Sequence, residues 1–100
     1  MTDINVALHV QIEALPGKEE EVAALLREGL ALVEEEPGTI AWFAVRLSTS
    51  TFAIFDVFPD DRARQAHLAG RLGSALTERA GELFATPSIE QLDVLAHKLP

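Results

Sequence analysis

Four segments of the chain have the residue pattern of β-strands. In residues 4–14 (INVALHVQIEA), apolar residues occupy the even positions and mostly polar residues the odd ones, as in a strand with one buried face. The segments TIAWFAVRL and TFAIFDVF are rich in branched and aromatic residues and are joined by STS, which predicts a hairpin. The closing segment IEQLDVLAHKL (89–99) alternates again, which predicts a fourth strand.

A helix is predicted between the first strand and the hairpin, from LPGKEEE to about Glu36, because its apolar residues recur at three- and four-residue spacing. Gly29 lies on that apolar stripe, where we expect a close approach of helix to sheet. Pro37 and Gly38 end the helix. The glutamate runs in KEEE and EEE are interpreted as solvated helix ends.

A second helical region is predicted after the hairpin, in two pieces. The sequence PDD caps a helix over about residues 60–69, which carries His67 on its inner face. A further piece covers about residues 73–84, and ATPS then forms a turn. The element order is therefore β-α-β-β-α-β over one domain, residues 1–100. This order is typical of the ferredoxin-like α+β fold, an antiparallel sheet with its helices on one face.

Such a fold leaves the other face of the sheet without helices. In the hairpin we expect that bare face to carry Trp42, Phe52, Ile54 and Phe58. An apolar patch of this size is rarely left exposed by a monomer. The sequence therefore predicts a homodimer in which two sheets face each other.

The composition of the chain argues against several classes of function. The chain has 100 residues and a net charge of −8 with only eight Lys and Arg, which argues against binding nucleic acid or an anionic membrane surface. The absence of cysteine excludes disulfides, thiolate nucleophiles and cysteine-based metal sites. No segment reaches transmembrane length, and MTDIN lacks the basic start of a signal peptide, so we expect a cytoplasmic protein.

Two polar residues interrupt apolar surroundings and are candidates for catalysis. His67 can act as a general base near neutral pH, or it can be a histidine hydrogen-bonded at the edge of the core. Asp56 can accept or orient a hydroxyl group. Its alternatives are an ion pair with Arg46, which lies on the same strand face, or a contact across a dimer.

Apolar side chains near these two residues are candidates for a substrate wall. Trp42, Phe58, Phe52 and Ile54 suit an aromatic ligand, although a core or interface role is the alternative for each. The spacing of the three histidines and the carboxylates does not resemble a metal site, so no metal is expected.

The stretches EPGTIAWFAVRL and FAIFDVFPDDRARQAHLAG, followed by a helix and a last strand, resemble the antibiotic biosynthesis monooxygenase family over nearly the whole chain. The resemblance implies a homodimeric α/β barrel of two ferredoxin-like protomers. The family includes quinol monooxygenases and haem-degrading enzymes. In the quinol branch, no metal or prosthetic group is used, and a deprotonated phenol or quinol reacts with oxygen itself.

The chain departs from the family pattern at several positions. Phe58 stands where the family most often has tryptophan, and Asp56 where it has glutamate. The haem-degrading branch requires an asparagine at about the position of Val10, a tryptophan at that of Phe58 and a histidine in the later stretch LGSALTERAG. None is present, so haem degradation is not expected.

Two functions of different classes follow from the sequence. The first is a cofactor-independent monooxygenase of a small aromatic or quinol-like substrate. In this enzyme His67 and Asp56 would take up and transfer the proton. The apolar side chains named above and Arg46 would line the substrate-binding site and exclude water from it. The second is a non-catalytic dimeric module, of a stress-response or regulatory type, that holds a small apolar ligand.

Overall fold

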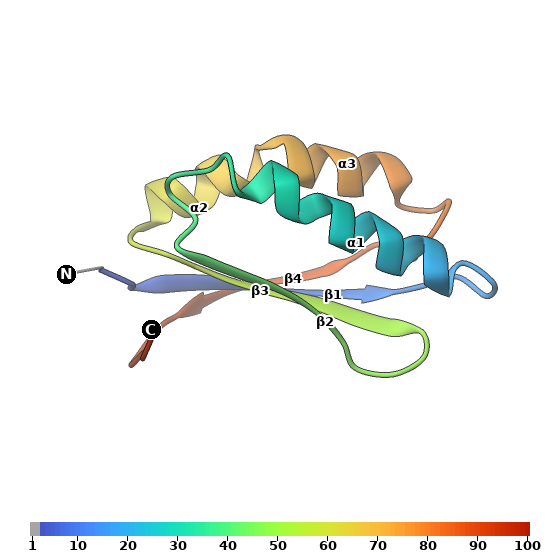
Figure 1. Ribbon diagram of the computed structural model, residues 1–100, viewed down its shortest axis with the longest axis horizontal. Helices are drawn as coiled ribbons and strands as arrows, with labels where there is room; N and C mark the ends of the chain where they lie inside the picture. The colour runs from blue at the N-terminus through green and yellow to red at the C-terminus, as the bar shows by residue number, and fades with distance from the viewer. Residues whose placement is uncertain (1–2) are drawn as a thin grey trace.

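The computed structural model describes residues 3–100. Over these residues the chain forms a four-stranded antiparallel sheet that three helices cover on one face (Figure 1). The strands lie in the order β2-β3-β1-β4. This is the predicted ferredoxin-like arrangement, which is confirmed. The elements are β1 (Val6–Glu13), α1 (Glu19–Val33), β2 (Ala41–Arg46), β3 (Thr51–Phe58), α2 (Asp61–Leu68), α3 (Arg71–Arg79) and β4 (Ser88–Asp93).

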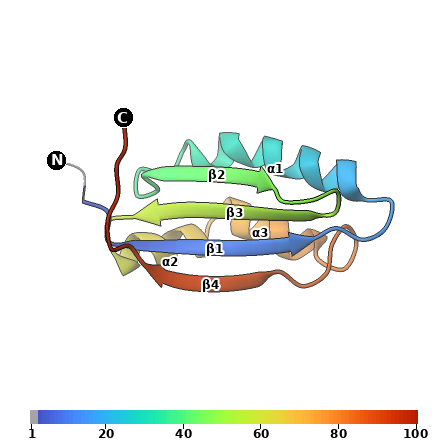
Figure 2. The ribbon, with the colours of Figure 1, turned by 90° about the horizontal axis from the view of Figure 1, so that it is seen from below.

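The last strand is shorter than the alternation of its sequence predicts. β4 ends at Asp93, which pairs with Val6, the first residue of β1. The backbone N–H of Val94 still donates to the carbonyl oxygen of Asn5, at 2.9 Å, but Asn5 lies before the first residue of β1. Alternation alone therefore overestimates the strand. Residues 94–100 instead cross one end of the helix-free face of the sheet (Figure 2), where Val94 packs beside Ala7 and Val57.

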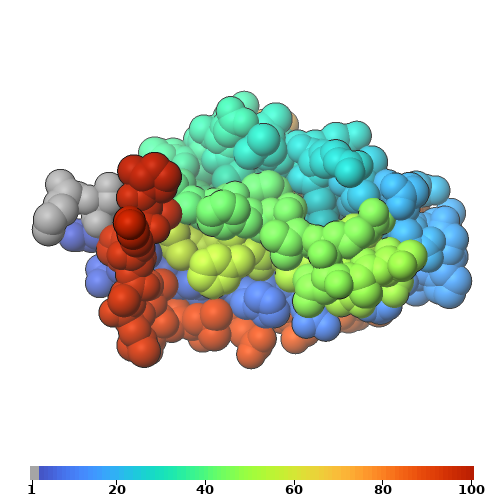
Figure 3. Space-filling view, turned by 60° about the horizontal axis from the view of Figure 1, so that its bottom comes forward, coloured from blue at the N-terminus to red at the C-terminus, as the bar shows by residue number. Residues whose placement is uncertain are grey.

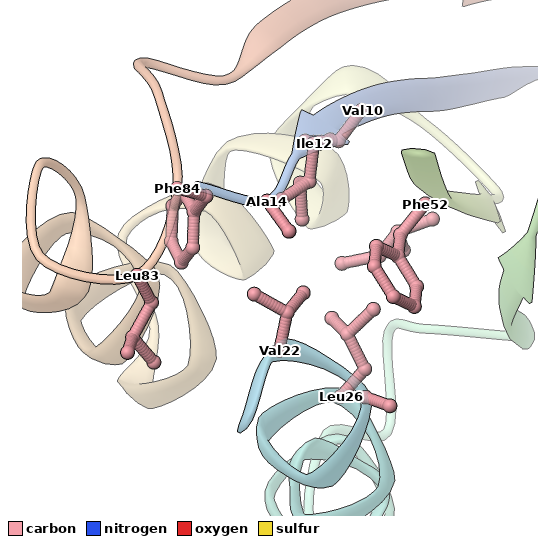
Figure 4. Close-up of a cluster of buried hydrophobic side chains, with 10 residues drawn as sticks. Val10, Ile12, Ala14, Val22, Leu26, Phe52, Leu83 and Phe84 are labelled. Atoms are coloured by element: carbon pink, nitrogen blue, oxygen red, sulfur yellow. The ribbon is translucent and has the colours of Figure 1, made fainter. Parts of the chain in front are cut away.

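The largest apolar core lies between the sheet and the helices. Val10, Ile12 and Phe52 extend from the sheet toward Val22 and Leu26 of α1 (Figure 4). Leu83 and Phe84, which follow α3, close the same cluster. Because β1 pairs with β3 in register, the even-numbered residues of both strands lie on this covered face.

The prediction of which hairpin residues lie on the bare face of the sheet is wrong. Phe52, Ile54 and Phe58 are almost fully buried beneath the helices, and Trp42 is half-buried on the same side. Both faces of the hairpin are apolar, so its own pattern could not decide which face is covered. Its register with β1 decides, because Phe55 pairs with the polar side of β1 at His9.

The bare face carries a different apolar patch. Phe43 and Val45 of β2 are 53% and 47% exposed, and Phe55 of β3 is 38% exposed. We call these three residues the open-face patch. Figure 3 shows this side of the molecule, with the C-terminal segment across the end away from the β2–β3 turn. Large exposed apolar patches are uncommon on monomers.

Arg64 fixes α2 to the sheet. Its Nη1 donates hydrogen bonds to the carbonyl oxygens of Ala7 and Leu92, at 3.3 and 3.1 Å, on strands β1 and β4. Asp60 caps the helix as predicted, because its Oδ1 accepts from the backbone N–H of Ala63 at 2.9 Å. His67 lies one turn after Arg64, so these contacts also set the position of its ring.

Replacing Arg64 with methionine is expected to lower the free energy of unfolding by about 2 kcal/mol, because a charged donor to two strand carbonyls is lost. Urea denaturation measures the change. Arg62→Met on the same helix is the control, since Arg62 is exposed. Equal losses in the two variants would contradict the anchoring role of Arg64.

Candidate active site

A cavity of about 280 Å³ lies between the sheet and helices α2 and α3. Its lining is mostly apolar, and Asp56 and His67 both reach it. The two residues that sequence reasoning selected for catalysis therefore meet at one cavity. The apolar side chains around them include Leu8, Val10, Ile54, Leu72, Leu76 and Ile89.

Asp56 is completely buried, although it carries a carboxylate. Its Oδ2 lies 2.8 Å from Nε2 of His67, in a close contact that lacks the alignment of a hydrogen bond. Its Oδ1 has no hydrogen-bond partner within residues 3–100. A buried carboxylate oxygen without a partner is costly. Asp56 thus retains hydrogen-bonding capacity beside the cavity.

The predicted alternative for Asp56, an ion pair with Arg46, is wrong. Nη2 of Arg46 donates instead to Oε2 of Glu20 on α1, at 2.8 Å. The guanidinium of Arg46 also lies 4.7 Å over the ring of Phe52. The basic side chain that contacts Asp56 is therefore that of His67 and not a guanidinium.

Glu36 is the site residue that sequence reasoning missed. Its Oε1 lies 2.5 Å from Nδ1 of His67 and accepts a hydrogen bond from the hydroxyl of Thr39 at 2.7 Å. The turn at Gly38 packs directly on α2, where an added Cβ would come within 3.0 Å of Ala63. This turn folds the end of the EEE run back onto His67, so Glu36 is not the solvated residue that the run predicts.

The two carboxylates control the charge of His67. Burial of the ring disfavours its charged form, but the contacts with Asp56 and then Glu36 outweigh burial and raise the pKa of His67 above its ordinary value of 6.5. The ring also lies 5.2 Å from that of Phe58, centroid to centroid. When His67 is protonated, both ring nitrogens carry hydrogen and each contacts a carboxylate, so the imidazolium cannot accept a further proton.

Glu36→Gln is expected to lower the pKa of His67, because one of its two negative neighbours becomes neutral. The titration of the imidazole C2–H signal by NMR measures this pKa. Glu35→Gln is the matched control, since exposed Glu35 pairs with Arg71 instead. Identical titration curves for the two variants would contradict the assigned contact.

The remaining predicted substrate residues do not all lie at this cavity. Ile54 lines it, whereas Phe58 is buried beside the imidazole of His67 and is not among the residues that line the cavity. Trp42, Phe52 and Arg46 line a separate hollow between α1 and β2, which we call the α1–β2 groove. The sequence predicted a single site because these residues share one strand face. In the structure they are divided between the cavity at Asp56 and the α1–β2 groove, on the same face of the sheet.

The described residues show neither a metal-binding cluster nor a membrane-spanning helix. Within residues 3–100, no group of three or more His, Cys, Asp and Glu side chains is arranged to hold a metal ion. Over the same part of the chain, no helix is both long and apolar enough to cross a membrane.

Comparison with known proteins identifies the family. The profile of the family described as antibiotic biosynthesis monooxygenase matches residues 5–79, and the chain belongs to this family. Those residues include β1, the turn with Glu36, and both Asp56 and His67. Among curated proteins, none matches the chain.

Solved structures agree on the fold. NE2512 of Nitrosomonas europaea, a protein of unknown function, is 45% identical and has a TM-score of 0.95, over 97% of this chain and 95% of its own. PA3566 of Pseudomonas aeruginosa is 23% identical with a TM-score of 0.81, over 96% and 99%. A structure named antibiotic biosynthesis monooxygenase is 19% identical with a TM-score of 0.77, over 91% and 99%.

Proposed function

We propose that the protein is a monooxygenase that needs no cofactor and acts on a small aromatic substrate with an acidic hydroxyl group, such as a quinol. The observation that carries this proposal is the buried carboxylate of Asp56, which has an unpartnered oxygen at an apolar cavity. Membership of the antibiotic biosynthesis monooxygenase family supports the class of reaction.

Asp56 is the proton acceptor in this proposal, and His67 is its partner. The hydroxyl of the substrate donates to Oδ1, while the imidazolium of His67 contacts Oδ2 and offsets the negative charge beside it. Glu36 holds His67 from the other side, through Nδ1. The assignment of base therefore moves from His67, as the sequence suggested, to Asp56.

Deprotonation makes the aromatic ring electron-rich enough to react with molecular oxygen. One oxygen atom forms a bond to a ring carbon, and the other leaves as water. The substrate supplies the electrons and becomes a hydroxylated quinone, so no external reductant is needed. The apolar lining keeps water from the reactive anion, and a cavity of about 280 Å³ suits a small ring system.

Oxygen uptake with a panel of quinols and anthrone-like phenols tests the proposal. Labelled oxygen gas is expected to place one labelled atom in the product and the other in water. Methyl ethers of the same substrates are the control, because they fit a similar volume but have no hydroxyl proton. Substrates that bind without any oxygen uptake would favour the non-catalytic ligand-binding module instead.

The open-face patch leads us to propose a homodimer, with two sheets face to face. Sedimentation is expected to give twice the mass of one chain for the native protein. Phe43→Glu is expected to give the mass of a single chain, because it places a charge at the centre of the contact. Leu30→Glu, at a similarly exposed position on α1, is the control. A native protein that is monomeric at micromolar concentration would refute the dimer.

A further inference from the structure

The α1–β2 groove differs chemically from the cavity at Asp56. It encloses about 400 Å³ beside β2, the edge strand of the sheet. Ala23, Leu26 and Phe52 are its buried apolar residues, and half-buried Trp42 adds a broad aromatic surface. Asp56 and His67 do not line it. The groove is thus a distinct hollow with an apolar interior.

Two arginines stand at the open side of this groove. Arg27 of α1 and Arg46 of β2 both line it with exposed side chains. Arg46 is held over the ring of Phe52, and its ion-pair partner Glu20 is 80% exposed. Arg27 has no ion pair within residues 3–100. The lining of the groove therefore contains two arginines and no carboxylate, although the chain carries a net charge of −8.

Trp42 adds a second polar observation. Its indole Nε1–H is buried and has no hydrogen-bond partner within the described residues. Such unpaired donors are rare in folded proteins, because burial without a partner costs free energy. Trp42 therefore contributes both an aromatic surface and a hydrogen-bond donor without a partner.

From these contacts we propose that the α1–β2 groove binds a small amphipathic anion, such as a carboxylate with an apolar body. The anionic group lies between Arg27 and Arg46, and the apolar body lies against Trp42 and Phe52. This site is independent of the proposed oxygenase activity. An anion is better suited to this groove than to the other cavity, where Asp56 and Glu36 flank one imidazole.

The chain contains its own probe of the groove. Trp42 is its one tryptophan, and tyrosine is absent, so intrinsic fluorescence reports on this hollow. Titration with octanoate is expected to change the emission in a saturable way. Octanamide, which has the same chain length but no charge, is the matched control and is expected to bind about 25-fold more weakly, in line with the loss of two exposed charge contacts.

Substitutions separate the arginines from general charge effects. Arg27→Gln and Arg46→Gln are each expected to weaken octanoate binding about fivefold and to leave octanamide unaffected. Arg62→Gln removes the same charge from α2, away from the groove, and is expected to change neither affinity. Leu30→Asp, at an exposed groove position, is expected to weaken octanoate by repulsion.

Three results would overturn the proposal. One is the absence of a saturable change in tryptophan emission with octanoate. Another is an equal loss of affinity in Arg62→Gln and Arg27→Gln. The third is a gain of octanoate affinity in Asp56→Asn, which would place the anion in the other cavity. These measurements need no oxygen and no turnover, so they test the anion site independently of the proposed oxygenase activity.

Discussion

Asp56→Asn is expected to slow oxygen uptake with a quinol substrate by about 10²- to 10⁴-fold, the usual contribution of a general base. Asparagine preserves the volume of the buried side chain, but its amide cannot accept the hydroxyl proton. We expect the loss in kcat, with KM little changed, because the apolar lining still binds the ring.

Two comparisons make this prediction specific. Asp93→Asn is the same substitution at an exposed position in β4 and is expected to keep the native rate. Methyl ethers of the substrate are expected to bind Asp56→Asn and the native protein equally. A variant at Asp56 that retains more than about a tenth of the native rate would assign the proton transfer to another group.

His67→Ala is expected to lower the free energy of unfolding by about 3–5 kcal/mol, the usual cost of removing one partner of a buried ion pair. The carboxylate of Asp56 would remain completely buried, without the cation that contacts its Oδ2. Urea denaturation near neutral pH measures the loss. A cost under about 1 kcal/mol would mean that the contact contributes little to stability.

A second variant allows the ion pair to be tested even if His67→Ala folds poorly. The double variant Asp56→Asn/His67→Gln replaces both charged groups with neutral amides of similar size. It is expected to be more stable than His67→Ala, because no uncompensated charge stays buried at Asp56. A double variant that is less stable than His67→Ala would contradict the ion-pair account.

The dependence of stability on pH follows from the same contacts. The folded-state pKa of His67 is raised, so the folded protein binds its proton more tightly than the unfolded chain does. This stabilisation is complete below about pH 6.5, the ordinary pKa, and is lost as pH rises through the folded-state pKa. His67→Ala is expected to lack that loss.

The sequence predicts the order of elements well, because each strand and helix has its own periodicity and its own stop signals. It also predicts that Asp56 and His67 approach each other. Asp56 lies on the covered face of β3, and His67 lies on the inner face of the helix that follows at once. Short connections make sequence neighbours meet, so both residues reach one cavity.

Contacts between distant segments are harder to predict. Glu36 reaches His67 across 31 positions, through a turn whose packing on α2 no local pattern encodes. The glutamate run containing it has the composition of an exposed helix end. The shared strand face was a different kind of failure. It groups Trp42 with Asp56 correctly, but it cannot show that Trp42 lines one hollow and Asp56 another.

The central position of β1 affects how the chain can fold. β1 pairs with β3 on one side and with β4 on the other, so the sheet is incomplete until β4 has been synthesised. Contacts between such distant segments form late, because closing the long loop costs entropy first. Asp56 and His67 can meet earlier, but Ile89 of β4 must arrive to close the cavity wall. We therefore expect a nascent chain to bring Asp56 and His67 together before the cavity beside them is closed.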